Sequence, residues 1–163
     1  QVIEIAHAAG VPVILNPAPA AVLKPEIYTM IDYLIPNETE IALLTGVEVI
    51  DDVTAKTAAD SLLVRGVKNV IVTLGSNGAY VANSTAHYHV DSQKVKAVDT
   101  TAAGDAFIGG FACALIRNFS LKEAVRFACC TGALATTRFG AQTSLPSLPE
   151  VTALYGQEGG ELK

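Results

Sequence analysis

Residues 98–105 of the sequence read VDTTAAGD and lead directly into an apolar run that is typical of a buried helix. The small residues let the backbone approach a ligand closely, and a helix start offers unpaired N–H groups and the positive end of the helix dipole. This combination predicts an anion hole for a phosphoryl group. Asp105 would stand at its mouth, where a carboxylate can accept the proton of an attacking hydroxyl.

Asp105 also has a purely structural interpretation. Aspartate is common at the N-cap of a helix, where its side chain binds free backbone N–H groups. We expect the helix to cover residues 105–117, so a capping role would suit its first residue. This segment alone leaves both interpretations open.

The residues before this segment alternate between strand and helix patterns. Short β-branched apolar runs predict buried strands, and amphipathic runs closed by glycine predict helices. Such alternation is typical of an α/β protein with a mostly parallel sheet, helices on both faces, and ligands beyond the carboxyl ends of the strands. The predicted strands are 11–15, 33–36 and 68–74, and the predicted helices are 2–9, 25–30, 38–44 (capped by Asn37) and 54–65.

The pattern changes after the turn at residues 75–78. Short strands at close spacing predict an antiparallel edge of the sheet, and apolar helices follow them. We interpret residues 1–155 as one domain and residues 156–163 as a flexible tail. The predicted edge strands are 79–82, 87–90 and 95–98, and the predicted helices are 105–117, 121–137 and 148–155.

Composition excludes several classes of protein. Half of the residues are hydrophobic and the net charge is −5, so neither a disordered chain nor a partner such as nucleic acid or an anionic membrane surface is expected. The longest uncharged runs near the C-terminus, 106–116 and 127–137, are too short to span a bilayer. The three cysteines have no metal-ligand spacing, which favours buried thiols in a reducing cytoplasm.

Five motifs occur in one order along nearly the whole chain, over residues 1–155. Neither GxGxxG nor GxxxxGK[ST] is present, so the Rossmann and P-loop interpretations have no support. The set resembles the ribokinase/phosphofructokinase-B family of carbohydrate kinases, and the first, second and last motifs resemble its ribokinase branch. The motifs are NPAPA (16–20), PNETE (36–40), TLGSNG (73–78), DTTAAGDAFIGGF (99–111) and TRFGAQTSLP (137–146).

The resemblance implies a reaction and the residues that perform it. The γ-phosphoryl group of ATP would pass to the 5-hydroxyl of D-ribose, giving ribose 5-phosphate and ADP. Asp105 would contact the sugar hydroxyl as the catalytic base, and Ala102, Ala103 and Gly104 would supply the amides of the anion hole. The implied nucleotide contacts are Asn37, Thr73, Leu74, Gly75, Ser76, Asn77, Gly78, Gly104 and Cys129.

The resemblance also implies two kinds of metal ion. Glu40 belongs to an N-x-x-E motif linked to Mg²⁺ and phosphate, although Asn37 and Glu40 could simply cap a helix. The loop 73–78, an implied nucleotide contact, could likewise be an ordinary turn. At the position of Cys129, near the adenine, family members more often carry an Asn or His. A monovalent cation, usually K⁺, would bind beside the anion hole, largely through backbone carbonyls. Its implied ligands are Asp99, Thr101, Ala135, Arg138, Gly140 and Ser144.

One part of the family pattern is absent from these residues. The chain begins at Gln1 and inside a predicted helix, so we expect it to belong to a longer protein. Family members hold the sugar, and form a dimer through a β-sheet lid, with an N-terminal part that this sequence lacks. We therefore expect the 163 residues alone to be inactive. Two alternatives stay open: a kinase for another sugar or a nucleoside, and a truncated product that binds nucleotide without catalysis.

Overall fold

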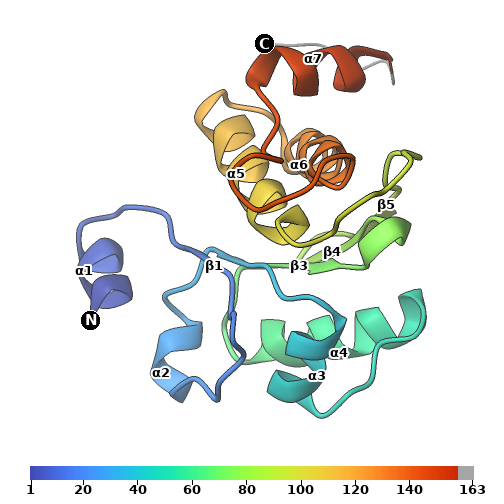
Figure 1. Cartoon of the computed structure of the whole chain (residues 1–163). Coiled ribbons are helices and arrows are strands. Elements are labelled where there is room, and N and C mark those ends of the chain that lie inside the picture. The colour runs from blue at the N-terminus through green and yellow to red at the C-terminus, as the bar shows by residue number, and fades with distance from the viewer. Residues whose placement is uncertain (158–163) are drawn as a thin grey trace. The chain divides into compact units, whose positions relative to one another are not determined.

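The computed structural model of the chain describes residues 1–157 (Figure 1). The chain forms two compact units, one made of Gln1–Leu74 with Ala79–His89 and the other of Gly75–Gly78 with Val90 onward. The predicted tail begins at residue 156, but residues 156 and 157 continue the last helix. Its remaining residues, 158–163, lie outside the described residues.

The first unit contains the predicted parallel strands. Strand β1 (Ile14–Leu15) pairs in parallel with β2 (Tyr33–Leu34), which pairs in parallel with β3 (Asn69–Thr73), as the sequence predicts. The first strand is shorter than expected. One reason is that the N–H of Val13 donates to the carboxylate of Asp32 at 2.8 Å, so it is not available for a strand ladder.

An antiparallel strand extends the sheet beyond β3. Strand β4 (Ala79–Asn83) pairs antiparallel with β3, and β5 (His87–Val90) completes the order β1-β2-β3-β4-β5. The predicted strand at residues 95–98 is wrong, because this segment has no regular structure. Its last N–H group, that of Val98, donates instead to the carbonyl of Thr136 at 2.7 Å.

Helices cover one face of the sheet in the first unit (Figure 1). Helix α3 (Glu38–Thr45) is capped at its start by Asn37, as predicted, and at its end by Gly46, which has a left-handed φ of 78°. Helix α4 (Asp52–Val64) starts two residues before the predicted position because Asp51 caps it. The other helices are α1 (Val2–Ala8) and α2 (Pro25–Tyr28). The core beneath α3 and α4 includes Leu34, Ile41, Leu44, Ala55, Ala58, Leu62, Val70 and Val72.

The second unit is built on two packed helices, α5 (Ala103–Ile116) and α6 (Leu121–Ala135), with α7 (Leu148–Gln157) against α6. Helix α5 begins two residues before the predicted Asp105, which makes Asp105 its third residue. A 3₁₀ turn, η1 (Gly75–Asn77), also belongs to this unit.

Two further sequence-based expectations concern composition. None of the helices within residues 1–157 is both long and apolar enough to cross a membrane. All three cysteines are free thiols, and two of them, Cys129 and Cys130, are buried as expected.

The contact between α5 and α6 yields the first prediction. A Cβ added at Gly110 would lie 2.7 Å from Cβ of Thr131, whose hydroxyl is held by the carbonyl of Phe127. Gly110→Ala should therefore lower the free energy of unfolding by about 1–3 kcal/mol through overpacking. Urea denaturation measures the change.

Gly109 provides the matched control. It is exposed on the same helix, and a Cβ there would meet nothing within 4 Å. Gly109→Ala should raise the free energy of unfolding by about 0.5–1 kcal/mol, because alanine favours the helix. Equal effects of the two substitutions would contradict the close packing of α5 on α6.

Candidate functional site

In the first unit, polar residues gather where the parallel strands end. Asn16 directly follows β1, and Asn37 forms a parallel bridge with Thr73 at the end of β3. The N–H of Thr73 donates to the carbonyl of Pro36 at 2.9 Å, which holds the ends of the second and third strands together. The carboxyl ends of parallel strands are the usual ligand-binding edge of such a sheet. Asn37 and Thr73, both predicted nucleotide contacts, therefore lie at one edge.

Asn37 and Glu40 form a capping box at the start of α3. The N–H of Asn37 donates to Oε2 of Glu40 at 2.9 Å, and Oδ1 of Asn37 accepts the N–H of Glu40 at 2.8 Å. Asn37 and Glu40 thus cap α3, as the structural interpretation of this pair expects. The capping box uses only one carboxylate oxygen, since Oε1 of Glu40 has no hydrogen-bond partner among residues 1–157.

Asn16 belongs to the NPAPA motif but was not among the predicted site residues. Its side-chain amide donates to the carbonyl of Ile35 at 2.9 Å and to Oε2 of Glu40 at 3.4 Å. The side chain thus links the end of β1 to the capping box. The sequence signal that could have pointed to Asn16 is a polar residue directly after a buried strand.

The predicted nucleotide loop continues from Thr73 through Leu74 into η1. Gly75, Ser76 and Asn77 are exposed, and Gly75 has a left-handed φ of 54°. Glycine is required at position 78 for a structural reason, because its φ is 97° and a Cβ would lie 2.7 Å from the backbone nitrogen of Ser92. The contact of these exposed residues with nucleotide stays a prediction.

The start of α5 carries the predicted catalytic residue. Its N-cap is Ala102, without a side-chain cap, and Asp105 is exposed in the first turn. The Asp105 carboxylate makes no hydrogen bond or ion pair with any described residue. The interpretation of Asp105 as a helix cap is therefore wrong.

The three predicted anion-hole amides differ in their surroundings. Ala102 is buried, Ala103 is half-buried and Gly104 is exposed. The N–H of Ala103 already donates to the carbonyl of Thr100 at 3.2 Å. The first intrahelical bond runs from Ala106 to the carbonyl of Ala102 at 2.9 Å, so the amide of Gly104 precedes the helical ladder.

The predicted cation ligands come from two loops of the second unit. Oδ1 of Asp99 accepts both the hydroxyl of Thr101 at 2.5 Å and its N–H at 3.0 Å, while Oδ2 accepts the N–H of Gly140 at 2.9 Å. The hydroxyl of Thr101, followed by the N–H of Gly140, holds the pKa of Asp99 below its usual value. Asp99 is therefore an anion that joins the two loops.

The remaining predicted cation ligands continue along the second loop. Ala135 is the buried last residue of α6. Ser144 is buried and donates its hydroxyl to the carbonyl of Ala141 at 2.9 Å. The side chain of Arg138 forms an ion pair with Glu150 of α7. Arg138 could therefore contribute to the predicted cation site only through its backbone carbonyl.

Glu150 carries a strongly perturbed carboxyl group. The Arg138 guanidinium, assisted by the N–H and hydroxyl of Ser147, lowers the pKa of Glu150 to about 2.

The pKa of Cys129 is shifted in the opposite direction, because burial raises it to about 12. Cys129 is thus a neutral thiol at physiological pH, and its contact with adenine stays a prediction.

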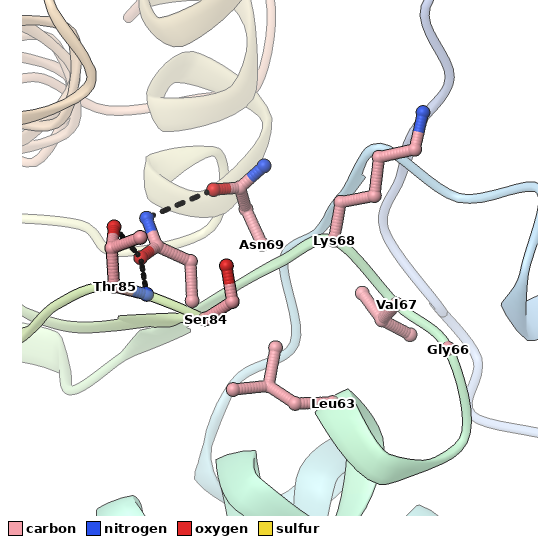
Figure 2. A pocket seen from close by; sticks show the side chains of 8 residues that line it. Leu63, Gly66, Val67, Lys68, Asn69, Ser84 and Thr85 are labelled. Carbon is pink, nitrogen blue, oxygen red and sulfur yellow. Dashed lines mark hydrogen bonds between the residues drawn. The ribbon is translucent and has the colours of Figure 1, made fainter.

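Two further features lie away from these residues. A pocket of about 490 Å³ lies at the amino end of β3, opposite to the strand end that carries Thr73 (Figure 2). Its lining consists of Leu63, Gly66, Val67, Lys68, Asn69, Asn83, Ser84 and Thr85. Among residues 1–157, no three His, Cys, Asp or Glu side chains are grouped as a metal site.

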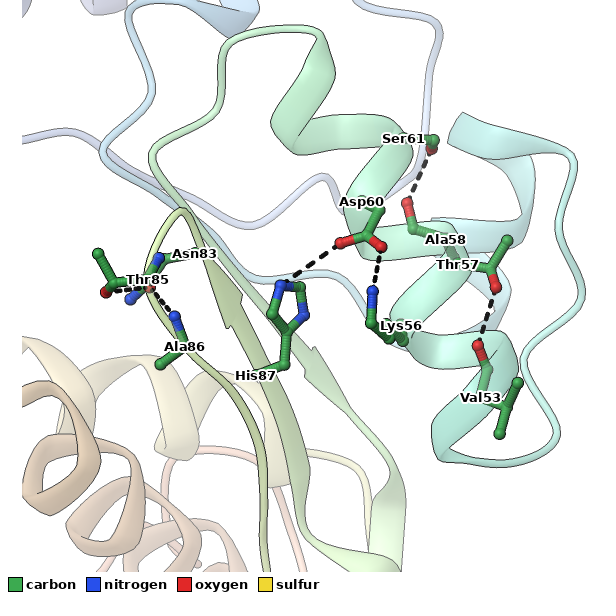
Figure 3. Close-up of polar contacts among 10 residues, drawn as sticks. All are labelled: Val53, Lys56, Thr57, Ala58, Asp60, Ser61, Asn83, Thr85, Ala86 and His87. Atoms are coloured by element: carbon green, nitrogen blue, oxygen red, sulfur yellow. Dashed lines mark hydrogen bonds and ion pairs between the residues drawn. The ribbon is translucent and has the colours of Figure 1, made fainter.

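Two of the three histidines, His87 and His89, lie close to carboxylates of α4. His87 of β5 approaches Asp60 of α4, with 3.6 Å between Nε2 and Oδ1, and Lys56 pairs with the same carboxylate at 2.5 Å (Figure 3). His89 lies 2.8 Å from Asp52. These pairs tie β5 to α4.

Comparison with known proteins gives consistent matches. Residues 1–148 match the pfkB family of carbohydrate kinases. A ribokinase from Haemophilus influenzae is 44% identical over 147 residues, which cover 90% of this chain and 48% of the relative. The chain thus spans about half the length of the curated relatives it matches.

Solved structures share the fold. The structure of Arabidopsis thaliana ribokinase complexed with ribose and ATP is 34% identical, with a TM-score of 0.90, over 95% of this chain and 51% of that one. Phosphofructokinase-2 from Escherichia coli in complex with potassium is 28% identical, with a TM-score of 0.81, over 98% of this chain and 52% of that one. The predicted α/β fold is therefore confirmed.

The Glu150 carboxyl provides a direct test of the loop geometry. Its pKa should be measured at about 2 by carbon NMR of the side-chain carboxyl. Because the folded-state pKa is depressed, the contacts are complete above the ordinary value of 4.5 and are lost as the pH falls toward 2. Arg138→Gln should raise the pKa of Glu150 by removing its main cause. A pKa near 4.5 in the unaltered chain would contradict the ion pair.

Proposed function

The chain belongs to the pfkB family of carbohydrate kinases, and on that premise we propose that the protein transfers the γ-phosphoryl group of ATP to the 5-hydroxyl of D-ribose. The products are ribose 5-phosphate and ADP. The observation that carries the proposal is the exposed carboxylate of Asp105 in the first turn of α5, which has no partner among residues 1–157. The ribokinases at 44% identity favour ribose as the acceptor.

Asp105 acts as the proton acceptor in the proposed reaction. The sugar oxygen forms a bond to the γ-phosphorus while the bond from that phosphorus to the β–γ bridging oxygen breaks, and the hydroxyl proton passes to the carboxylate. The transferring group carries negative charge on its equatorial oxygens. The amide of Gly104 and the positive end of the α5 dipole stabilise that charge.

ATP and Mg²⁺ are assigned to residues at, and directly after, the carboxyl ends of β2 and β3. Asn37, Thr73 and the exposed residues Gly75–Asn77 are proposed to contact the nucleotide. Oε1 of Glu40, which the capping box leaves without a partner among the described residues, fits an interaction with hydrated Mg²⁺. Bound Mg²⁺ would neutralise phosphate charge, which this acidic chain does not offset with a cluster of lysines.

A monovalent cation site is proposed around Asp99. The ionised carboxylate and the loop backbone from Arg138 to Ser144 offer oxygen ligands, which suit a hard cation such as K⁺. The similarity to a phosphofructokinase-2 in complex with potassium supports this assignment. The cation would add positive charge close to the chain segment that leads into α5.

Two alternatives have their own support. The chain spans about half of its relatives' length, so residues outside it could select another sugar or a nucleoside. For the same reason the 163 residues by themselves could bind nucleotide without catalysis. Assaying ADP release with ribose, 2-deoxyribose, fructose and adenosine, on both the 163-residue chain and the protein expressed from its complete reading frame, separates these cases.

Ribose should give the highest kcat/KM of the panel, and only in the protein from the complete reading frame. Transfer requires both reactants to be held at once, so the 163 residues alone should show no turnover. Preference for another acceptor would overturn the ribose assignment. Turnover by the short chain would instead overturn its expected inactivity.

Asp105→Asn tests the role of the carboxylate in the active protein. It should lower kcat by roughly 10²–10⁴, because the proton acceptor is lost. The fold should survive with less than about 1 kcal/mol of change, since only a first-turn dipole interaction is removed. ATP affinity should hold or rise slightly. Steady-state kinetics beside a thermal melt measures all three.

Asp52→Asn is the matched control for this substitution. Asp52 is an exposed first-turn aspartate of α4, outside every proposed ligand contact; because it pairs with His89, a thermal melt accompanies its kinetics. Its substitution should leave kcat unchanged. A near-normal kcat for Asp105→Asn would remove Asp105 from the mechanism.

A further inference from the structure

We infer that Glu150 is a positioning residue that holds the cation-binding loop in shape. This inference rests on the monovalent-cation site proposed above. The loop in question is residues 138–147, which connect α6 to α7 and contain the proposed ligands Arg138, Gly140 and Ser144.

The loop has few anchors of its own. Its internal bonds are local turns, such as that from the hydroxyl of Thr143 to the carbonyl of Phe139 at 3.0 Å. Gly140 has a left-handed φ of 94°, and its N–H is held by Asp99. Many of its residues are exposed, so the apolar core does little to fix their backbone.

Glu150 joins the two ends of this loop with one carboxylate. Oε1 pairs with the guanidinium of Arg138 at the start of the loop. Oε2 accepts the N–H of Ser147 at 2.8 Å and its hydroxyl at 2.7 Å at the end of the loop. The three bonds close residues 138–147 on α7.

Helix α7, which carries Glu150, is itself fixed by aromatic packing. The ring of Tyr155 lies 5.5 Å from that of Phe127 and 5.8 Å from that of Phe119. The guanidinium of Arg126 lies 5.6 Å from the Tyr155 ring centroid. Glu150 therefore projects from a helix that is packed on α6, and it holds the loop against that helix.

A cation site made largely of backbone carbonyls needs such support. A backbone carbonyl cannot move toward an ion independently of the chain, as a side chain can. Its position therefore depends on the contacts that hold the loop. The proposed ligand Arg138 contributes only its backbone, and its side chain is the one that Glu150 holds. Because this ion pair is partly exposed, it adds little to global stability, and its loss should appear in cation affinity.

The test compares two glutamates in equivalent structural positions. Glu123 caps α6 through Ser120, as Glu150 bonds Ser147 at the start of α7. Thermal unfolding midpoints are measured against KCl, with choline chloride keeping the ionic strength constant. A ligand that binds only the folded state raises the midpoint, so the K⁺ dependence gives a dissociation constant.

Glu150→Gln should raise the K⁺ dissociation constant about three- to tenfold, the range for losing one partly exposed charged contact and its hydrogen bonds. Arg138→Gln, which leaves the Ser147 bonds intact, should raise it in the same direction. Glu123→Gln should lower the midpoint at all KCl concentrations without changing the K⁺ dissociation constant.

Each outcome has a separate meaning. An unchanged K⁺ dissociation constant in both Glu150→Gln and Arg138→Gln would overturn the positioning role while leaving the cation site intact. An equal rise in Glu123→Gln would show a general loss of stability and would also overturn it. If K⁺ and choline act identically on the unaltered protein, the proposed cation site itself fails, and the inference fails with it.

Discussion

The close approach of α5 to α6 is the constraint on which the proposed chemistry depends. Gly110 faces Thr131, and a Cβ at Gly132 would lie 3.2 Å from the carbonyl of Ala103. Glycine at both positions lets the two helix backbones approach closely, and Gly132 lies against Ala103, the first residue of α5. The end of α6 adds a second restraint, since the carbonyl of Thr136 accepts the N–H groups of Val98 and Asp99.

These restraints bear on how an acidic chain would bind phosphate in the proposed reaction. The chain has a net charge of −5, and the motif contains no lysine cluster. In the proposed reaction, phosphate is therefore attracted by backbone amides, the helix dipole and bound cations. Asp99 is the ionised centre of this arrangement. Its carboxylate holds Thr101 and Gly140, and the same charge is the one formal anion among the proposed cation ligands. Asp105 is left without a partner among the described residues.

Much of the fold could be predicted from local sequence signals. The caps at Asn37 and Gly46, and the β-branched run that forms β3, depend on neighbouring residues and were found where expected. The errors have physical causes that lie far away in the sequence. Residues 95–98 look like a strand, but the Val98 N–H bonds to Thr136. Asp105 looks like a cap, yet α5 begins at Ala103, where the chain leaves the Thr100 turn.

The candidate site residues came from motifs, and their roles stay predictions. Motif resemblance proposed Asn37, Glu40, Asp99 and Asp105. It could not reveal that Asn16 reaches Glu40, or that Glu150 holds Arg138, since both contacts join separate elements. The residue count between such pairs says nothing about their distance in the fold.

The central claim is that the Asp105 carboxylate accepts the proton of the sugar hydroxyl, and chemical rescue tests it most directly. In Asp105→Ala, expressed from the complete reading frame, single-turnover phosphoryl transfer is measured at saturating ATP and ribose while formate is added at constant ionic strength. The account predicts a slow rate that rises with formate and not with chloride, because formate supplies the lost proton acceptor. A rate that formate leaves unchanged, in a variant that still binds ATP, would contradict it.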